Sequence, residues 1–257
     1  MTTATHHTRS GTVGRLRPWA EIAAGLVPLL VVAGVTARVF GLPPTYLLRA
    51  VALYLLGATI VVRHLPTRRS RPGLGPANHV TLGRATLVMA IAALVPEPAV
   101  LTDNGHWWII AVTTLALSLD GVDGWIARRT GTATAFGARF DMELDTFLML
   151  VLAALVWRSG RVGPWVLLLG GLPRYLFVAA GWRWRWLRAP LPERMRRKAG
   201  CVVQGIALLV CLGPIVPPRL ASVAAALTVV LLYSSFAVDI WWLKTHGPQT
   251  ATDGLRV

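Results

Sequence analysis

The chain has 257 residues, of which 54% are hydrophobic, with a mean hydropathy of +0.57 and a formal net charge of +15. Its apolar residues fall in runs close to twenty residues long, which is the length of a bilayer span, so an ordinary soluble domain is excluded. Such a charge in a soluble protein would indicate nucleic-acid binding. Here the basic residues lie in loops between apolar runs, where they meet anionic lipid. We therefore expect an all-α integral membrane protein that binds no nucleic acid.

The apolar pattern predicts eight membrane helices, at roughly residues 18–41, 45–63, 78–96, 106–128, 140–158, 163–182, 199–216 and 220–243. A loop rich in proline, glycine and arginine follows the second of them and predicts a module boundary. We expect residues 1–75 to form a tail, two extra transmembrane helices and a basic linker. Residues 76–245 then form a six-helix core, and residues 246–257 form a polar tail.

The arginines predict the orientation of these helices. The loops at 63–75, 128–139 and 183–198 are rich in arginine, and the loops on the opposite side are poorer. Because basic loops remain in the cytoplasm, we expect these three loops and both termini to lie on the cytoplasmic side.

Four aspartates interrupt the fourth and fifth predicted helices, where ionisable groups are costly and usually functional: Asp120, Asp123, Asp141 and Asp145. Their spacings, three and four residues, place each pair on one helical face. Four carboxylates at one point in an apolar setting need cations to neutralise them. Oxygen ligands without histidine or cysteine favour Mg²⁺ or Mn²⁺, which commonly bind together with a substrate phosphate.

The aspartates belong to a longer pattern, D-x-x-D-G-x-x-A-R followed after eight residues by G-x-x-x-D-x-x-x-D, which adds Gly124, Ala127, Arg128 and Gly137. This pattern resembles the signature of the CDP-alcohol phosphotransferase family, integral membrane enzymes of phospholipid synthesis. A weaker resemblance to the family's P-N-x-x-T-x-x-R stretch lies upstream at Asn78, Thr81 and Arg84, with one residue inserted after the proline. The resemblance covers roughly residues 76–243.

The resemblance implies a catalytic core and a homodimer. A substituted phosphoryl group passes from a CDP-linked lipid donor, expected to be CDP-diacylglycerol, to an alcohol, and CMP is released. Two Mg²⁺ or Mn²⁺ ions are expected at the four aspartates, with Asp145 also the base that activates the acceptor hydroxyl. The expected donor-binding residues are Asn78, Thr81, Arg84, Gly124, Ala127, Arg128 and Gly137.

The acceptor site is predicted from basic residues in the second half of the chain. Arg174 lies in an apolar run and needs a partner there. The family places basic residues at this point and after the next loop to hold an anionic acceptor, which gives Arg174, Arg194, Arg197 and Lys198 here. Glycerol 3-phosphate and inositol phosphate are the expected acceptors. The chain departs from the family's K-x-K-T-x-x-Q pattern at Gly200 and Cys201. Lys198 also stands at the start of a predicted helix, where a lysine commonly extends its amine to the membrane surface without binding a substrate.

Two other function classes use acidic residues in membrane helices. A Mg²⁺-dependent prenyltransferase needs a second aspartate-rich motif, but the acidic residues after Asp145 are isolated. A divalent-cation transporter predicts two related halves with matching polar residues, and no such repeat is visible. It also gives no role to Gly124, Ala127 and Arg128.

Overall fold

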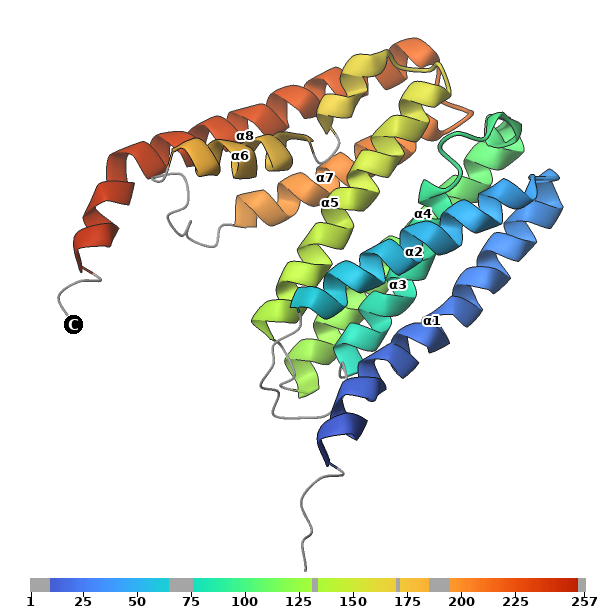
Figure 1. The fold of residues 1–257 in the computed structure, drawn as a ribbon. Helices are drawn as coiled ribbons and strands as arrows, with labels where there is room; N and C mark the ends of the chain where they lie inside the picture. Colours follow the sequence, from blue (N-terminus) through green and yellow to red (C-terminus); the bar gives the residue numbers. More distant parts are fainter. Residues whose placement is uncertain (1–9, 65–75, 131–133, 170–171, 185–194, 254–257) are drawn as a thin grey trace, which may run out of the picture. The chain divides into compact units, whose positions relative to one another are not determined.

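The computed structural model describes residues 10–64, 76–130, 134–169, 172–184 and 195–253 (Figure 1). These residues form helices and no strand, so the all-α prediction is confirmed. The elements are α1 (Ser10–Phe40), α2 (Pro44–His64), α3 (Pro76–Ala92), η1 (Pro98–Val100), α4 (Asp103–Thr130), α5 (Ala135–Arg158), η2 (Pro164–Leu169), α6 (Leu172–Arg183), α7 (Met195–Leu212) and α8 (Pro218–Asp253).

Three of these helices contain stretches long and apolar enough to cross a membrane, Ile22–Phe40, Pro44–Arg63 and Pro218–Trp242. Shorter apolar helices lie at Val80–Ala92 and Gly200–Leu212. Helices α4 and α5 have 28 and 24 residues, enough for a span, but they carry the charged signature residues. These findings agree with an integral membrane protein.

Several helices depart from the predicted spans. Helix α1 begins at Ser10, eight residues early, α7 ends at Leu212, four residues early, and α8 continues to Asp253, into the predicted polar tail.

Two further differences share one cause. Helix α3 ends at Ala92, four residues before the predicted end, and a turn leads into η1 at Pro98. The sixth predicted span, 163–182, is replaced by the 3-10 helix η2 and the 12-residue α6. Prolines account for both, because a proline has no backbone N–H and disfavours helix in the residue before it. Apolarity alone does not reveal such breaks.

The chain divides into two compact units, residues 1–144 and 145–257, and the division falls within α5. In the first unit α3 packs against α1, α2 and α4 (Figure 1). The centre of this unit is apolar and fully buried: Leu29 from α1, Tyr46 from α2, Ile91 from α3 and Ile109 from α4.

The turn from α1 to α2 follows from its sequence. Gly41 has a φ of 61°, a conformation that glycine adopts without strain. The Leu42 amide donates to the Ala37 carbonyl at 2.9 Å, which completes a Schellman cap on α1. Pro44 then begins α2 at a position where no N–H is needed.

Polar contacts join the two amino-terminal helices to the rest of the first unit. The Tyr46 hydroxyl donates to the Ala90 carbonyl of α3 at 3.2 Å, and the Trp108 indole of α4 donates to Thr36 Oγ1 of α1 at 3.1 Å. Arg49 of α2 forms an ion pair with the buried Glu97 that follows α3. The predicted module boundary at residue 75 stays a prediction. Helices α1 and α2 nevertheless bury side chains against the same α3 that carries Arg84.

Deleting residues 1–62 is expected to lower the thermal stability of the remaining protein in detergent. The deletion removes the side chains that pack against α3. It also removes interhelical hydrogen bonds, each of which contributes about 0.6 kcal/mol to the stability of a membrane protein. The measurement is a thermal unfolding curve of purified truncated and full-length protein. A deletion of residues 1–9 serves as the control, and equal melting temperatures for all three proteins would contradict the expectation.

In the second unit α7 packs against α8, and η2 packs against both α6 and α8. Arg161 closes the end of α7, since its guanidinium donates to the carbonyls of Cys211 at 2.9 Å and Gly213 at 2.7 Å and also to that of Val216. Carbonyls at a helix end have no partner within the helix, so this arginine fixes the turn between α7 and α8.

Candidate active site

The signature residues lie where α4 ends and α5 begins. Helix α4 ends at Thr130 and α5 begins at Ala135. Thr134 caps α5, because its Oγ1 accepts a hydrogen bond from the Gly137 amide at 3.0 Å, and its carbonyl accepts one from Ala138 at 3.0 Å. Thr134, at the end of the threonine-rich stretch, therefore fixes the start of α5 through these two hydrogen bonds.

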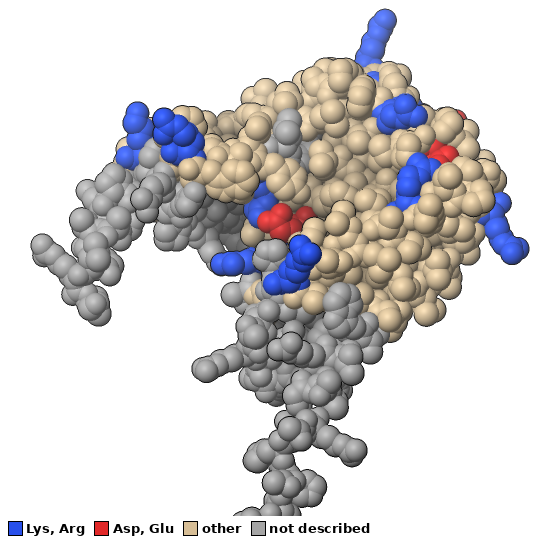
Figure 2. All heavy atoms as spheres, viewed as in Figure 1, with Lys and Arg blue, Asp and Glu red and all other residues tan. Residues whose placement is uncertain are grey.

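Three signature carboxylates meet at this point. Asp120 of α4 and Asp141 and Asp145 of α5 each offer an oxygen, and these oxygens lie within 4.8 Å of one another. Asp141 and Asp145 share a face of α5 through their four-residue spacing. Figure 2 shows a gathering of acidic atoms on a face made mostly of uncharged residues. Asp123 lies one turn after Asp120 in α4, and its side chain is outside the described part of the structure.

A buried arginine reaches the same carboxylates from α3. Arg84 is 1% exposed, and its Nη1 lies 2.7 Å from Asp120 Oδ1 and also forms an ion pair with Asp141 Oδ1. A buried guanidinium is stable only when paired, so α3, α4 and α5 are joined through this one group. The pairing was not predicted from sequence. The available signal was an arginine in an apolar helix, which must find an acidic partner.

The donor set of the cluster fits a hard divalent ion. The oxygens of Asp120, Asp141 and Asp145 are all carboxylate oxygens, the ligands that Mg²⁺ and Mn²⁺ prefer. The Arg84 guanidinium pairs with two of these carboxylates and offsets part of their negative charge.

The structure places the other predicted donor residues on the same three helices. Thr81 is buried in α3, one turn before Arg84, and Gly124 in α4 and Gly137 in α5 are partly buried. Asn78 lies in α3, and Ala127 and Arg128 lie in the last turns of α4, with side chains outside the described part. Their contact with a donor stays a prediction.

The predicted acceptor residues belong to α6 and α7. Arg174 lies in the first turn of α6 and is partly buried. Arg197 and Lys198 lie in the first turn of α7, with side chains outside the described part, and Arg194 lies outside the described residues. The predicted acceptor group therefore also stays a prediction.

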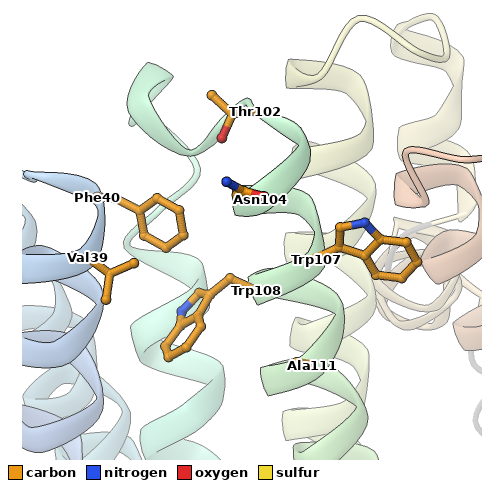
Figure 3. A pocket seen from close by; sticks show the side chains of 7 residues that line it. All are labelled: Val39, Phe40, Thr102, Asn104, Trp107, Trp108 and Ala111. Atoms are coloured by element: carbon orange, nitrogen blue, oxygen red, sulfur yellow. The ribbon is translucent and has the colours of Figure 1, made fainter.

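A cavity of about 520 Å³ lies at the other end of α4 and is lined by Val39, Phe40, Thr102, Asn104, Trp107, Trp108 and Ala111 (Figure 3). Phe40 and Trp108 meet edge to face with ring centroids 6.2 Å apart, whereas Trp107 points to the other side of α4 (Figure 3). Trp108 precedes Asp120 by twelve residues, which is about 18 Å along the helix. This cavity is therefore separate from the carboxylates.

Residues 75–241, more than half of the chain, match the family model for CDP-alcohol phosphatidyltransferase. This chain is a member of the CDP-alcohol phosphatidyltransferase family. The match includes every residue of the signature, and the predicted family membership is confirmed.

Among individual proteins, this chain is similar to cholinephosphotransferase 1 of Homo sapiens, with 28% identity over 117 residues, and to that of Bos taurus, with 27% identity over 117 residues. Cholinephosphotransferase 1 of Danio rerio is 27% identical over 130 residues. These segments cover 43% to 48% of this chain but only 29% to 33% of those relatives. No solved structure gives a significant match.

Proposed function

We propose that this protein transfers a substituted phosphoryl group from a CDP-linked donor to an alcohol hydroxyl at the carboxylate cluster, with release of CMP. The observation that supports the proposal most strongly is the convergence of Asp120, Asp141 and Asp145 within 4.8 Å, in a chain that carries the complete family signature. Prenyl transfer would need a second aspartate-rich motif, and cation transport gives no role to the signature residues Gly124, Ala127 and Arg128.

Asp120, Asp123, Asp141 and Asp145 are the residues that would hold Mg²⁺ or Mn²⁺, as two ions. When bound, the metal neutralises charge on the donor's diphosphate and on the departing phosphate. The chain's own residues then position the reactants. The predicted donor-binding residues on α3, α4 and α5 surround the nucleotide and diphosphate of the CDP-linked substrate. Arg128 is suited to bind phosphate because its guanidinium can donate two parallel hydrogen bonds.

Asp145 is the proposed base. It lies one turn beyond Asp141 on α5. A diphosphate bound at Asp120 and Asp141 would therefore lie beside it, displaced along the helix. Its carboxylate takes the proton from the acceptor hydroxyl while the hydroxyl oxygen forms a bond to the donor's β-phosphorus. The bond from that phosphorus to the bridging oxygen breaks, and CMP leaves with the bonding electrons.

The proposed donor is CDP-diacylglycerol and the proposed acceptor is anionic, glycerol 3-phosphate or inositol phosphate. The donor is proposed from the family resemblance, and the acceptor is proposed from the basic residues of the predicted acceptor site, above all Arg174. We also propose a homodimer in the membrane, with the carboxylate cluster near the cytoplasmic face. The arginine-rich loops at 63–75, 128–139 and 183–198 support that orientation.

The relatives support a second candidate within the same reaction class. Cholinephosphotransferases are named for the transfer of a phosphocholine group, so the small headgroup, and not the lipid, would be linked to CDP. Purified protein supplied with CDP-diacylglycerol or with CDP-choline, each with the matching acceptor, separates the two candidates. We expect CMP release from CDP-diacylglycerol. Release from CDP-choline and not from CDP-diacylglycerol would show that CDP-choline is the donor.

Replacing Arg174 with alanine is expected to raise the acceptor KM by about 10- to 150-fold and to leave the donor KM nearly unchanged. The loss of a charge-assisted contact to a phosphate costs about 1.5–3 kcal/mol. The measurement is steady-state kinetics with each substrate varied in turn. Arg183→Ala, at the exposed end of the same helix, is the control. An unchanged acceptor KM in folded Arg174→Ala would remove the argument for an anionic acceptor.

A further inference from the structure

We infer that Arg84 is a positioning residue of the metal site, which holds Asp120 and Asp141 from their buried side and leaves their outer oxygens for the metal. The inference rests on the proposed function, because it assumes that these carboxylates bind a divalent ion. It assigns Arg84 a different task from contact with the CDP-linked donor.

Arg84 reaches the cluster from the interior of the protein. The Arg84 side chain is 1% exposed, whereas the side chains of Asp120 and Asp141 are 39% and 35% exposed. The guanidinium therefore lies on the interior side of the carboxylates. A metal ion and a nucleotide diphosphate arrive from the open side, which the arginine does not occupy.

One nitrogen of Arg84 contacts two carboxylates. Nη1 of Arg84 contacts Oδ1 of Asp120 and Oδ1 of Asp141, so one donor atom fixes two carboxylates that come from different helices. Each carboxylate has a second oxygen, which could bind a metal ion. Carboxylates that bind metals are commonly oriented by such outer hydrogen bonds, and the loss of one typically weakens metal binding 10- to 100-fold.

Arg84 also supplies positive charge to a crowded group of carboxylates. Asp120, Asp141 and Asp145 place three carboxylates within 4.8 Å, and like charges this close repel one another. One guanidinium offsets part of this charge and keeps α4 and α5 together before metal binds. It does not cancel the cluster's negative charge, which remains available to attract a divalent ion.

The test compares Arg84→Met, Arg84→Lys and the wild-type protein by Mn²⁺ titration, followed by electron paramagnetic resonance, and by thermal unfolding with EDTA or Mn²⁺. Arg84→Met removes the charge and keeps an unbranched apolar side chain. We expect it to bind Mn²⁺ about 10- to 100-fold more weakly and to melt at a lower temperature in EDTA, with part of the loss recovered at high Mn²⁺. Because a single nitrogen makes both contacts, Arg84→Lys should restore part of the Mn²⁺ affinity.

The control is Arg49→Met, which breaks the ion pair with Glu97 in the same unit and lies outside the signature. It should lose thermal stability and keep the wild-type Mn²⁺ affinity. Folded Arg84→Met with wild-type or higher Mn²⁺ affinity would overturn the inference, since the arginine would then be only structural or would compete with the metal. A wild-type protein that binds no Mn²⁺ would instead overturn the proposed metal site. A variant too unstable to purify would be replaced by Arg84→Lys, whose Mn²⁺ affinity must still fall below wild type.

Discussion

Replacing Asp145 with asparagine is expected to lower the turnover number by about 10²- to 10⁴-fold, the usual contribution of a general base. Asparagine keeps the shape of the side chain but cannot accept the proton of the acceptor hydroxyl. Asp145 is also the carboxylate farthest along α5, one turn from Asp141, so the donor's main contacts should remain. We therefore expect a small change in donor affinity beside a large loss of rate.

The measurement is a single-turnover assay of CMP release, together with equilibrium binding of the CDP-linked donor. Glu143→Gln is the matched control, because Glu143 is an exposed carboxylate on the same helix but faces away from Asp141 and Asp145. A rate for Asp145→Asn within about threefold of wild type would show that another group removes the proton.

Replacing Asp120 with asparagine is expected to raise the Mn²⁺ concentration needed for half-maximal activity by at least about tenfold, with donor affinity falling in parallel. Asparagine supplies a neutral oxygen, so the cluster loses a charge that attracts the ion. The change also leaves Arg84 with one acidic partner fewer, which should lower stability in EDTA.

Asp103→Asn is the control for this variant, because Asp103 is an exposed carboxylate in the first turn of the same helix. Its Mn²⁺ dependence should equal that of wild type. An unchanged Mn²⁺ requirement in Asp120→Asn would show that Asp120 is not a metal ligand.

Local rules were enough to predict much of the fold and part of the site. The apolar lengths predicted both ends of α2 and the end of α1 within one residue, although α1 begins eight residues earlier than predicted. The glycines and threonines between 130 and 137 marked the break between α4 and α5. The four-residue spacing of Asp141 and Asp145 fixed their common face as soon as α5 was helical. In each case the determining interaction lies within a few residues of the chain.

Features that depend on packing between distant segments were not predicted. The partners of Arg84 follow from how α3 lies against α4, and an apolar helix does not reveal which neighbour it will meet. The Tyr46 and Trp108 hydrogen bonds that join α1 and α2 to the core have the same origin. The break in the sixth span was missed because its hydrophobicity fits a helix, whereas its prolines favour interruption.

The most direct measurement of the central claim is a transfer assay on the purified protein in lipid. The protein is incubated with labelled CDP-diacylglycerol, Mg²⁺ or Mn²⁺, and one alcohol at a time from a panel that includes glycerol 3-phosphate and inositol phosphate. CMP and the lipid product are then quantified together. We expect equal amounts of CMP and a new phospholipid, formed only with the divalent ion and about 10²- to 10⁴-fold more slowly by Asp145→Asn. Metal-independent release of CMP, or no CMP from any CDP-linked donor including CDP-choline, would contradict it.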